Sequence, residues 1–234
     1  MKTRLVILTI VAVTLLAAGV SFAGIALTKH NLSSAAGANS TIKSTGAGST
    51  DQLCIFCHTP HRADTTSGPS LWNRNNATAV GGYTLYGSGN KTLGNSTVSN
   101  PNPASRACLS CHDGNNAINA VINTAGVAGT FTMPDVAGRL SGNKLDAASG
   151  YNLGTNLSND HPISVTYDIT KSSLNTLTAG TGVVRVTSDT TGQGTSGSAT
   201  VECTSCHDPH TSASSYFLRA TTAGSKLCLV CHNK

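Results

Sequence analysis

Four copies of the pentapeptide Cys-x-x-Cys-His constrain this 234-residue chain more than any other feature, because together they use every cysteine it contains. Each copy places two thiols on one face of a helical turn and an imidazole directly after the second thiol. This is the attachment pattern of c-type haem, in which the thiols form thioethers and the imidazole is the proximal iron ligand. The sequence therefore predicts four covalently bound haem c groups. The predicted attachment cysteines are Cys54, Cys57, Cys108, Cys111, Cys203, Cys206, Cys228 and Cys231, and the predicted proximal ligands are His58, His112, His207 and His232.

Three other uses of paired cysteines fit this pattern less well. Zinc ribbons need no histidine directly after each cysteine pair. A disulfide framework usually spreads its cysteines more irregularly. A thioredoxin-like redox motif occurs once, beside a βαβ pattern that this sequence lacks. Haem attachment is the interpretation that accounts for every cysteine and for the histidine that follows each pair.

The chain has eight histidines, so four remain, one for each predicted haem. Two of them stand three residues after a proximal histidine, in His58-Thr59-Pro60-His61 and His207-Asp208-Pro209-His210. Because each is so close in sequence to the proximal ligand, it lies on the proximal side of its own haem and cannot reach the distal face of that iron. It can reach the distal face of a neighbouring haem. We therefore predict bis-histidine ligation at all four irons. The predicted distal ligands are His30, His61, His161 and His210, with His30 serving the first or second haem and His161 a haem in the central part of the chain.

Bis-histidine ligation bears on function, because an iron with both axial positions filled has no free site for a substrate. Such a haem gains and loses an electron, at a lower potential than a His/Met haem. Met133 is the one methionine outside the amino-terminal leader. It could be an axial ligand in principle, but methionine is more often core filler. The sequence thus predicts electron transfer and no enzymatic activity.

The amino terminus predicts export. Lys2 and Arg4 precede an apolar run from Leu5 to about Val20, and Ser21-Phe22-Ala23 offers the small residues of a signal-peptidase site. We expect residues 1–23 to be a cleaved signal peptide and residues 24–234 to form a single tetrahaem domain with no membrane span. An uncleaved anchor is the alternative, but the run is short and no stop-transfer pattern follows it. The expected location is extracellular or at the cell surface, with the periplasm as the alternative.

Composition predicts a fold organised by its cofactors. Aromatic residues are 4% and charged residues 11% of the chain, so side-chain burial alone offers little to offset conformational entropy. We expect a mostly irregular chain with short helices at the CxxCH motifs and a few short strands, a small multihaem cytochrome c fold around stacked haems. Residues 163–169 alternate as a half-buried strand does, with 182–187 as the predicted partner. Segments rich in Gly, Ser, Thr and Asn, predicted to be surface loops, are 35–50, 87–103 and 187–200.

The formal net charge of +5 does not indicate nucleic-acid binding. The leader carries two of the positive charges, and four haems would add eight propionates that the iron charges only partly offset. The holoprotein then has a net charge of about −1 when oxidised and about −5 when reduced. It therefore lacks the excess of positive charge that is typical of a nucleic-acid-binding protein.

Residues around the motifs resemble a known family. They include Lys-His-Asn-Leu-Ser from Lys29, Cys-x-x-Cys-His-Thr-Pro-His from Cys54, Asn-Asp-His-Pro-Ile-Ser from Asn159 and the closing Leu-Cys-Leu-Val-Cys-His-Asn-Lys. The chain resembles multihaem cytochromes with doubled CxxCH motifs, and most closely the tetrahaem outer-surface cytochromes of metal-reducing bacteria, the OmcE type. This resemblance implies head-to-tail polymerisation into extracellular filaments, with one distal histidine supplied by the neighbouring subunit. Carried over, that role falls to one of the four predicted distal histidines, and we favour His61.

Two other functions share these motifs. A monomeric periplasmic electron shuttle would differ only in its assembly state. A multihaem reductase would need one five-coordinate iron and a substrate pocket, and a high-spin haem signal would reveal it. The expected partners are further copies of the chain, together with redox proteins or extracellular electron acceptors.

Overall fold

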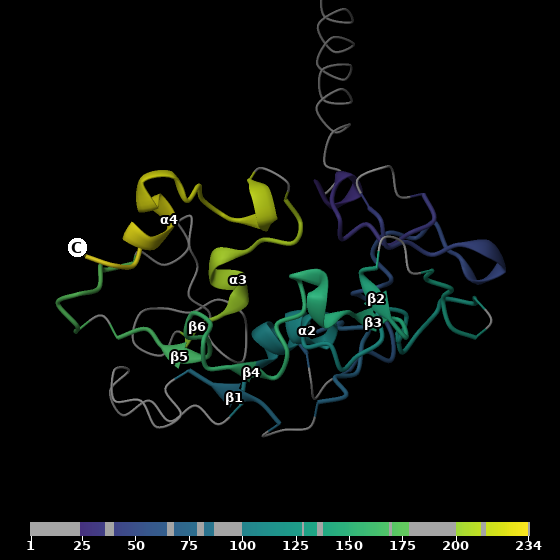
Figure 1. Ribbon diagram of the computed structural model, residues 1–234, viewed down its shortest axis with the longest axis horizontal. Helices are drawn as coiled ribbons and strands as arrows, with labels where there is room; N and C mark the ends of the chain where they lie inside the picture. Colours follow the sequence, from purple (N-terminus) through teal and green to yellow (C-terminus); the bar gives the residue numbers. More distant parts are fainter. Residues whose placement is uncertain are drawn as a thin grey trace, which may run out of the picture.

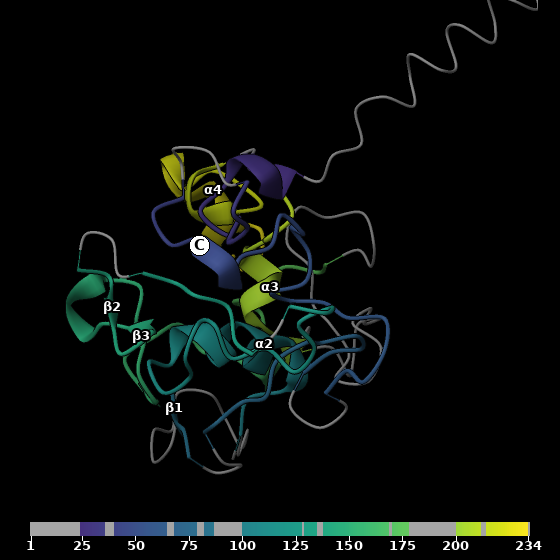
Figure 2. The same cartoon turned by 90° about the vertical axis from the view of Figure 1, so that its right-hand side faces the viewer.

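The computed structural model describes residues 24–35, 40–64, 68–78, 82–86, 100–127, 129–134, 138–168, 170–177, 200–211 and 214–233. Over these ranges the chain is mostly irregular, with few short helices and small strands, which confirms the predicted fold class (Figures 1 and 2). None of the described helices is both long enough and apolar enough to cross a membrane. The predicted signal peptide, residues 1–23, lies outside the described residues.

The described α-helices lie at three of the four CxxCH motifs, as the spacing predicts, whereas the first motif, residues 54–58, forms a turn and no helix. The α-helices are α2 (Pro103–His112), α3 (Cys203–Cys206) and α4 (Lys226–Leu229), and the single turns of 3-10 helix are Gly24–Leu27, Gly46–Gly48, Ala147–Ser149, Ser215–Phe217 and Ala223–Ser225. The longest of them is α2, which has ten residues. Pro103 starts it with a backbone angle already suited to a helix, and five of its residues are buried, so packing extends it.

Three two-stranded ladders tie distant segments together. Strands β1 (Thr84–Leu85) and β4 (Asn156–Leu157) pair in parallel, β2 (Leu140–Ser141) and β3 (Lys144–Leu145) form an antiparallel hairpin, and β5 (Val165–Thr166) pairs antiparallel with β6 (Thr200–Val201). Gly142 and Asn143, with φ of 56° and 63°, make the hairpin turn, which requires positive φ at both central positions. Figures 1 and 2 show α2 and α3 side by side near the centre of the molecule.

The predicted strand at 163–169 is present only as the two-residue strand β5, because its ladder partner is just as short. Its partner is β6, whereas the predicted partner 182–187 lies outside the described residues. The described part of the predicted loop 35–50 is largely irregular, and Gly46 and Ala47 are exposed as expected. Three polar side chains of this segment, Ser40, Ser44 and Thr50, are instead buried and hydrogen-bonded. Of the other two loops, 87–99 and 187–199 also lie outside the described residues.

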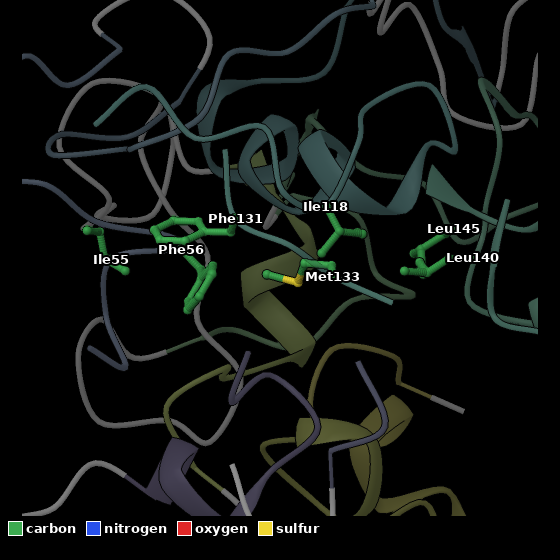
Figure 3. Close-up of a cluster of buried hydrophobic side chains, with 7 residues drawn as sticks. All are labelled: Ile55, Phe56, Ile118, Phe131, Met133, Leu140 and Leu145. Atoms are coloured by element: carbon green, nitrogen blue, oxygen red, sulfur yellow. The ribbon is translucent and has the colours of Figure 1, made fainter. Parts of the chain in front are cut away.

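The main apolar cluster lies beside the first two motifs (Figure 3). Phe56, inside the first CxxCH motif, packs against Phe131 with ring centroids 4.8 Å apart. Each fully buried phenyl ring contributes roughly 2–3 kcal/mol of hydrophobic stabilisation. Met133 is buried in the same cluster, so it packs as core filler. The members are Ile55, Phe56, Ile118, Phe131, Met133, Leu140 and Leu145.

A second, smaller cluster packs β1 and β4 against α2; its buried members are Tyr83, Leu85, Leu109 and Leu157. Besides these clusters the interior contains many polar side chains, including the fully buried Asn73 and Arg74. Such groups stabilise a fold only when they are hydrogen-bonded. Hydrogen bonds therefore carry much of the organisation around the motifs, in keeping with the low aromatic content.

Candidate haem sites

All four CxxCH motifs adopt a tight turn that brings the histidine back toward the first cysteine. In three of them the histidine N–H donates to the carbonyl of that cysteine: His58 to Cys54 (2.8 Å), His207 to Cys203 (3.0 Å) and His232 to Cys228 (2.9 Å). The second motif lies in the last turns of α2. All eight cysteines are unpaired thiols, so none is used in a disulfide. In a haem c site each of these sulfurs would be a thioether.

A separate segment of the chain clamps three of the turns in the same way. One residue of the segment donates its backbone N–H to the carbonyl of the second motif cysteine at 2.8–2.9 Å. The side chain of the same residue donates to the carbonyl of the residue after the first cysteine at 2.5–2.8 Å. We call these the clamp residues; they are Asn73 at the first motif, Arg219 at the third and Asn175 at the fourth.

The clamp residues follow no sequence signature. Asn73 and Arg219 come after their motifs at different separations, whereas Asn175 precedes its motif. Their shared geometry therefore becomes visible only in the structure. By holding two carbonyls of each turn, they fix the direction in which the motif presents its cysteines and its histidine, which makes them positioning residues.

Three of the four motif histidines lie beside a histidine from another part of the chain. The ring-centroid separations are 6.1 Å for His58 and His210, 6.0 Å for His112 and His30, and 6.4 Å for His232 and His161. Each pair joins a predicted proximal ligand to a predicted distal ligand. His161 lies beside the last motif, whereas we expected a haem in the central part of the chain; the clamp made by Asn175 brings its segment to α4.

These separations match two imidazoles that share one metal ion. Two metal–imidazole bonds of about 2 Å, each with about 1.1 Å from nitrogen to ring centre, separate the centroids by roughly 6.2 Å. Within these described pairs no hydrogen bond joins the two histidines, so direct bonding between the rings does not explain this spacing. The residues present therefore fit a haem iron held between the two rings of each pair.

Ring orientation also suits metal binding. Nδ1 of His112 lies 2.8 Å from the carbonyl of Tyr151, and Nδ1 of His207 lies 2.8 Å from that of Tyr216. A carbonyl can only accept, so Nδ1 carries the proton and Nε2 keeps its lone pair. Metal-ligating histidines are held in this way, with the second nitrogen bonded to a backbone carbonyl.

His30 is the most enclosed of the distal candidates. Burial, followed by the nearby His112 and other histidines, lowers the pKa of His30 to about 4, so its imidazole is neutral at physiological pH. Its ring stacks on Phe217 with centroids 4.3 Å apart and planes inclined by 18°. A neutral ring held on one face is a ligand with a fixed orientation.

A thiol of each motif lies close to a thiol of the next motif along the chain. Burial, and then the Cys111 thiol, raise the pKa of Cys57 to about 12, which places the first motif beside the second. A hydrogen bond with Cys203 raises the pKa of Cys108 well above its ordinary value, which places the second beside the third. Burial, and then Cys231, raise the pKa of Cys206, which places the third beside the fourth. The four motifs therefore form a continuous series.

His61 and His207 are the two histidines left over. All eight histidines are among the described residues, and neither His61 nor His207 belongs to one of the three ring pairs. Besides burial, the charge of His207 does contribute to lowering the pKa of His30 and of His112. Both side chains are exposed. His61 is a predicted distal ligand and His207 a predicted proximal one. The two remaining histidines could therefore make up one proximal–distal pair.

Residues 197–234 match the doubled CXXCH motif family, and this stretch contains the third and fourth motifs. No curated protein matches the chain. CxxCH motifs indicate covalently bound haem c, and their doubling supports a multihaem c-type cytochrome involved in electron transfer.

Proposed function

We propose that this chain is a secreted tetrahaem c-type cytochrome that transfers electrons over long distances along bis-histidine haems, and that it assembles into extracellular filaments. The main support is the set of three histidine pairs at 6.0–6.4 Å, because each joins a CxxCH histidine to a histidine from a distant segment. Two axial histidines leave an iron no position for a substrate, so the proposed role is electron transfer and not catalysis.

Haem bound at each motif would supply the one-electron chemistry. The chain's own residues attach, orient and space it. Two cysteines would hold each group, and the paired histidines would bind its iron at the first, second and fourth motifs. The clamp residues keep the turn in place at the first, third and fourth motifs. The neighbouring thiols set the order of sites from the first motif to the fourth, which is what stepwise electron transfer requires.

The unpaired histidines support assembly. His207 needs a second axial ligand, His61 needs an iron, and both are exposed. We propose that His61 of one copy serves the haem attached beside His207 of the next, so that an iron–nitrogen bond links the subunits. A contact of this kind is heterologous, and it propagates into a filament when the rotation between subunits does not close into a ring.

The same observations leave two alternatives to test. In a monomeric shuttle, His207 would share its iron with water or with a weak ligand. In a reductase, that open position would be the substrate site. Both differ from the proposal at one place, the distal side of the His207 haem.

Two variants test the assembly. In His61→Ala, the proposal expects soluble monomers with four haems, one of which lacks its distal ligand. In the matched variant His210→Ala, the lost ligand belongs to the in-chain pair with His58, so one haem also becomes high spin but filaments persist. Negative-stain microscopy and the high-spin absorbance band separate the outcomes. Normal filaments from His61→Ala would contradict the proposed link.

The haem number and the location need a separate measurement. Intact mass of protein released from cells should correspond to residues 24–234 plus four haems. A lower haem count, or an intact leader, would contradict the tetrahaem and secretion parts of the proposal respectively.

A further inference from the structure

Two buried charges of opposite sign lie against different CxxCH turns, and neither forms an ion pair with a described residue. Arg74 is fully buried, and Glu202 is 2% exposed. By contrast, Asp208 forms ion pairs with Arg219 and His210. Burying an unpaired charge is costly, so each of these charges is held in place by a specific set of polar groups.

Arg74 lies between the first and second motifs. Its neighbour Asn73 is the clamp residue of the first motif, and its own guanidinium donates to the carbonyl of Ser110, inside the second motif, at 3.3 Å. It also donates to the carbonyls of Ile118 (2.7 Å) and Ala117 (2.6 Å), while Nε is buried without a partner. Every partner is a neutral carbonyl, so the positive charge is fixed but not cancelled.

Glu202 lies at the start of the third motif, directly before Cys203. Its carboxylate accepts hydrogen bonds, and all of the donors are neutral groups. These donors are Asn102 Nδ2 (2.8 Å), Thr200 Oγ1 (2.7 Å), Ser164 Oγ (3.0 Å) and Ser105 Oγ. These hydrogen bonds hold the carboxylate in place without an opposite charge beside it, as the carbonyls do for the guanidinium of Arg74.

We propose that Arg74 and Glu202 are redox-tuning charges: Arg74 raises the reduction potential of the haem at the first motif, and Glu202 lowers that of the haem at the third. This rests on the proposed attachment of haem at each motif. Reduction removes one positive charge from an iron, so a nearby cation favours the reduced form and a nearby anion the oxidised form. Burial makes each charge effective, because solvent and salt screen it little.

The net effect of nearby charges on the reduction potential has no single sign at the second motif. It has Arg74 on one side, the buried cation Arg106 in its own helix, and the buried carboxylate of Asp113 directly after His112. These charges act in opposite senses there. Neutralising Arg74 nevertheless has a definite sign at the first motif, where its charge acts on Cys57. Neutralising Glu202 likewise has a definite sign at the third motif, which it directly precedes.

The test is a redox titration of the purified, secreted holoprotein, followed by optical absorbance and electron paramagnetic resonance. The first motif's histidine pair is the most nearly parallel of the three, at 20°, against 53° and 73°. Near-parallel imidazoles give a rhombic low-spin signal, which distinguishes this haem from the other in-chain pairs. Its midpoint can then be followed separately.

Arg74→Gln should lower the midpoint of the rhombic signal, and Glu202→Gln should raise a different transition. At the midpoint potential of the wild type, each substitution should change the ratio of reduced to oxidised haem at its motif by more than about five-fold. Five-fold is about the largest effect expected of an exposed charge pair. Arg74→Lys keeps the charge and should retain the midpoint. The exposed residues Lys226 and Asp51, close to the fourth and first motifs, give the control variants Lys226→Gln and Asp51→Asn, whose shifts should be smaller.

Haem content by mass separates this inference from the proposed function. Variants with a full complement of haem and unchanged midpoints would overturn the tuning role while leaving the cytochrome intact. Shifts of both variants in the same direction would also overturn it, since loosened packing, not charge, would then be the cause. If Arg74→Gln fails to accumulate, Glu202→Gln decides alone: its gain in potential supports the inference, and an unchanged or lower potential refutes it.

Discussion

Asn73 offers the sharpest test of how the motif turns are held, because its side chain is fully buried and every polar atom of it is used. Nδ2 donates to the carbonyls of Ile55 (2.5 Å) and Asn123 (2.8 Å), and Oδ1 accepts from the Asn123 N–H (2.9 Å). Asn73→Ala removes all three hydrogen bonds. At about 1 kcal/mol for each, the loss is about 3 kcal/mol, and more if the Ile55 carbonyl stays dry.

The assay is urea unfolding of the holoprotein, monitored by circular dichroism and haem absorbance. With a slope of about 2 kcal/mol per molar urea, the midpoint of Asn73→Ala should fall by about 1.5 M. Asn73→Asp should be at least as damaging, since it places an acceptor against two carbonyl oxygens. The control is Asn175→Ala at the fourth motif, whose equivalent bond to Leu229 is exposed. Its other two side-chain bonds, to the carbonyls of Val230 and His232, are long at 3.4 and 3.5 Å, so the total cost should be about 1 kcal/mol, below that of Asn73→Ala. Equal midpoints for wild type and Asn73→Ala would refute the clamp.

Other consequences follow from the same geometry. Replacing His161 by Ala should convert about one haem in four to high spin and raise its potential, because His161 faces His232; an unchanged spectrum would make His161 a bystander. Protein made without haem attachment should be largely unfolded by circular dichroism, since so little apolar surface is available; a native-like spectrum would contradict this. Burial raises the pKa of Tyr83 and Tyr167 from 10 to about 12. Their contribution to stability is therefore complete below pH 10 and lost as the pH rises toward 12, and the urea midpoint should fall over that window.

The local chemistry of the sites could be predicted from the sequence, because it is set by spacing within five residues. Two thiols three apart followed by an imidazole can only be used together on a turn, and each motif forms one. The irregular fold was also predictable, since the chain has few large apolar side chains and abundant Gly, Ser, Thr and Asn.

What could not be predicted depends on contacts between distant segments. His161 lies beside His232 because Asn175 and the β5–β6 ladder bring its segment to α4, and no local pattern encodes that approach. Asn73 and Arg74 look like ordinary polar residues in the sequence. Only the structure reveals that they are buried between two motifs, where a neutral amide and an unpaired cation take different roles.

The most direct test of the account is cryo-electron microscopy of material sheared from cells that express this chain. The account predicts filaments in which three irons of each subunit lie between the pairs His58–His210, His112–His30 and His232–His161. It predicts that the fourth iron lies between His207 and His61 of the neighbouring subunit. Density that joins His61 to a haem of its own chain, or an open position opposite His207, would contradict it.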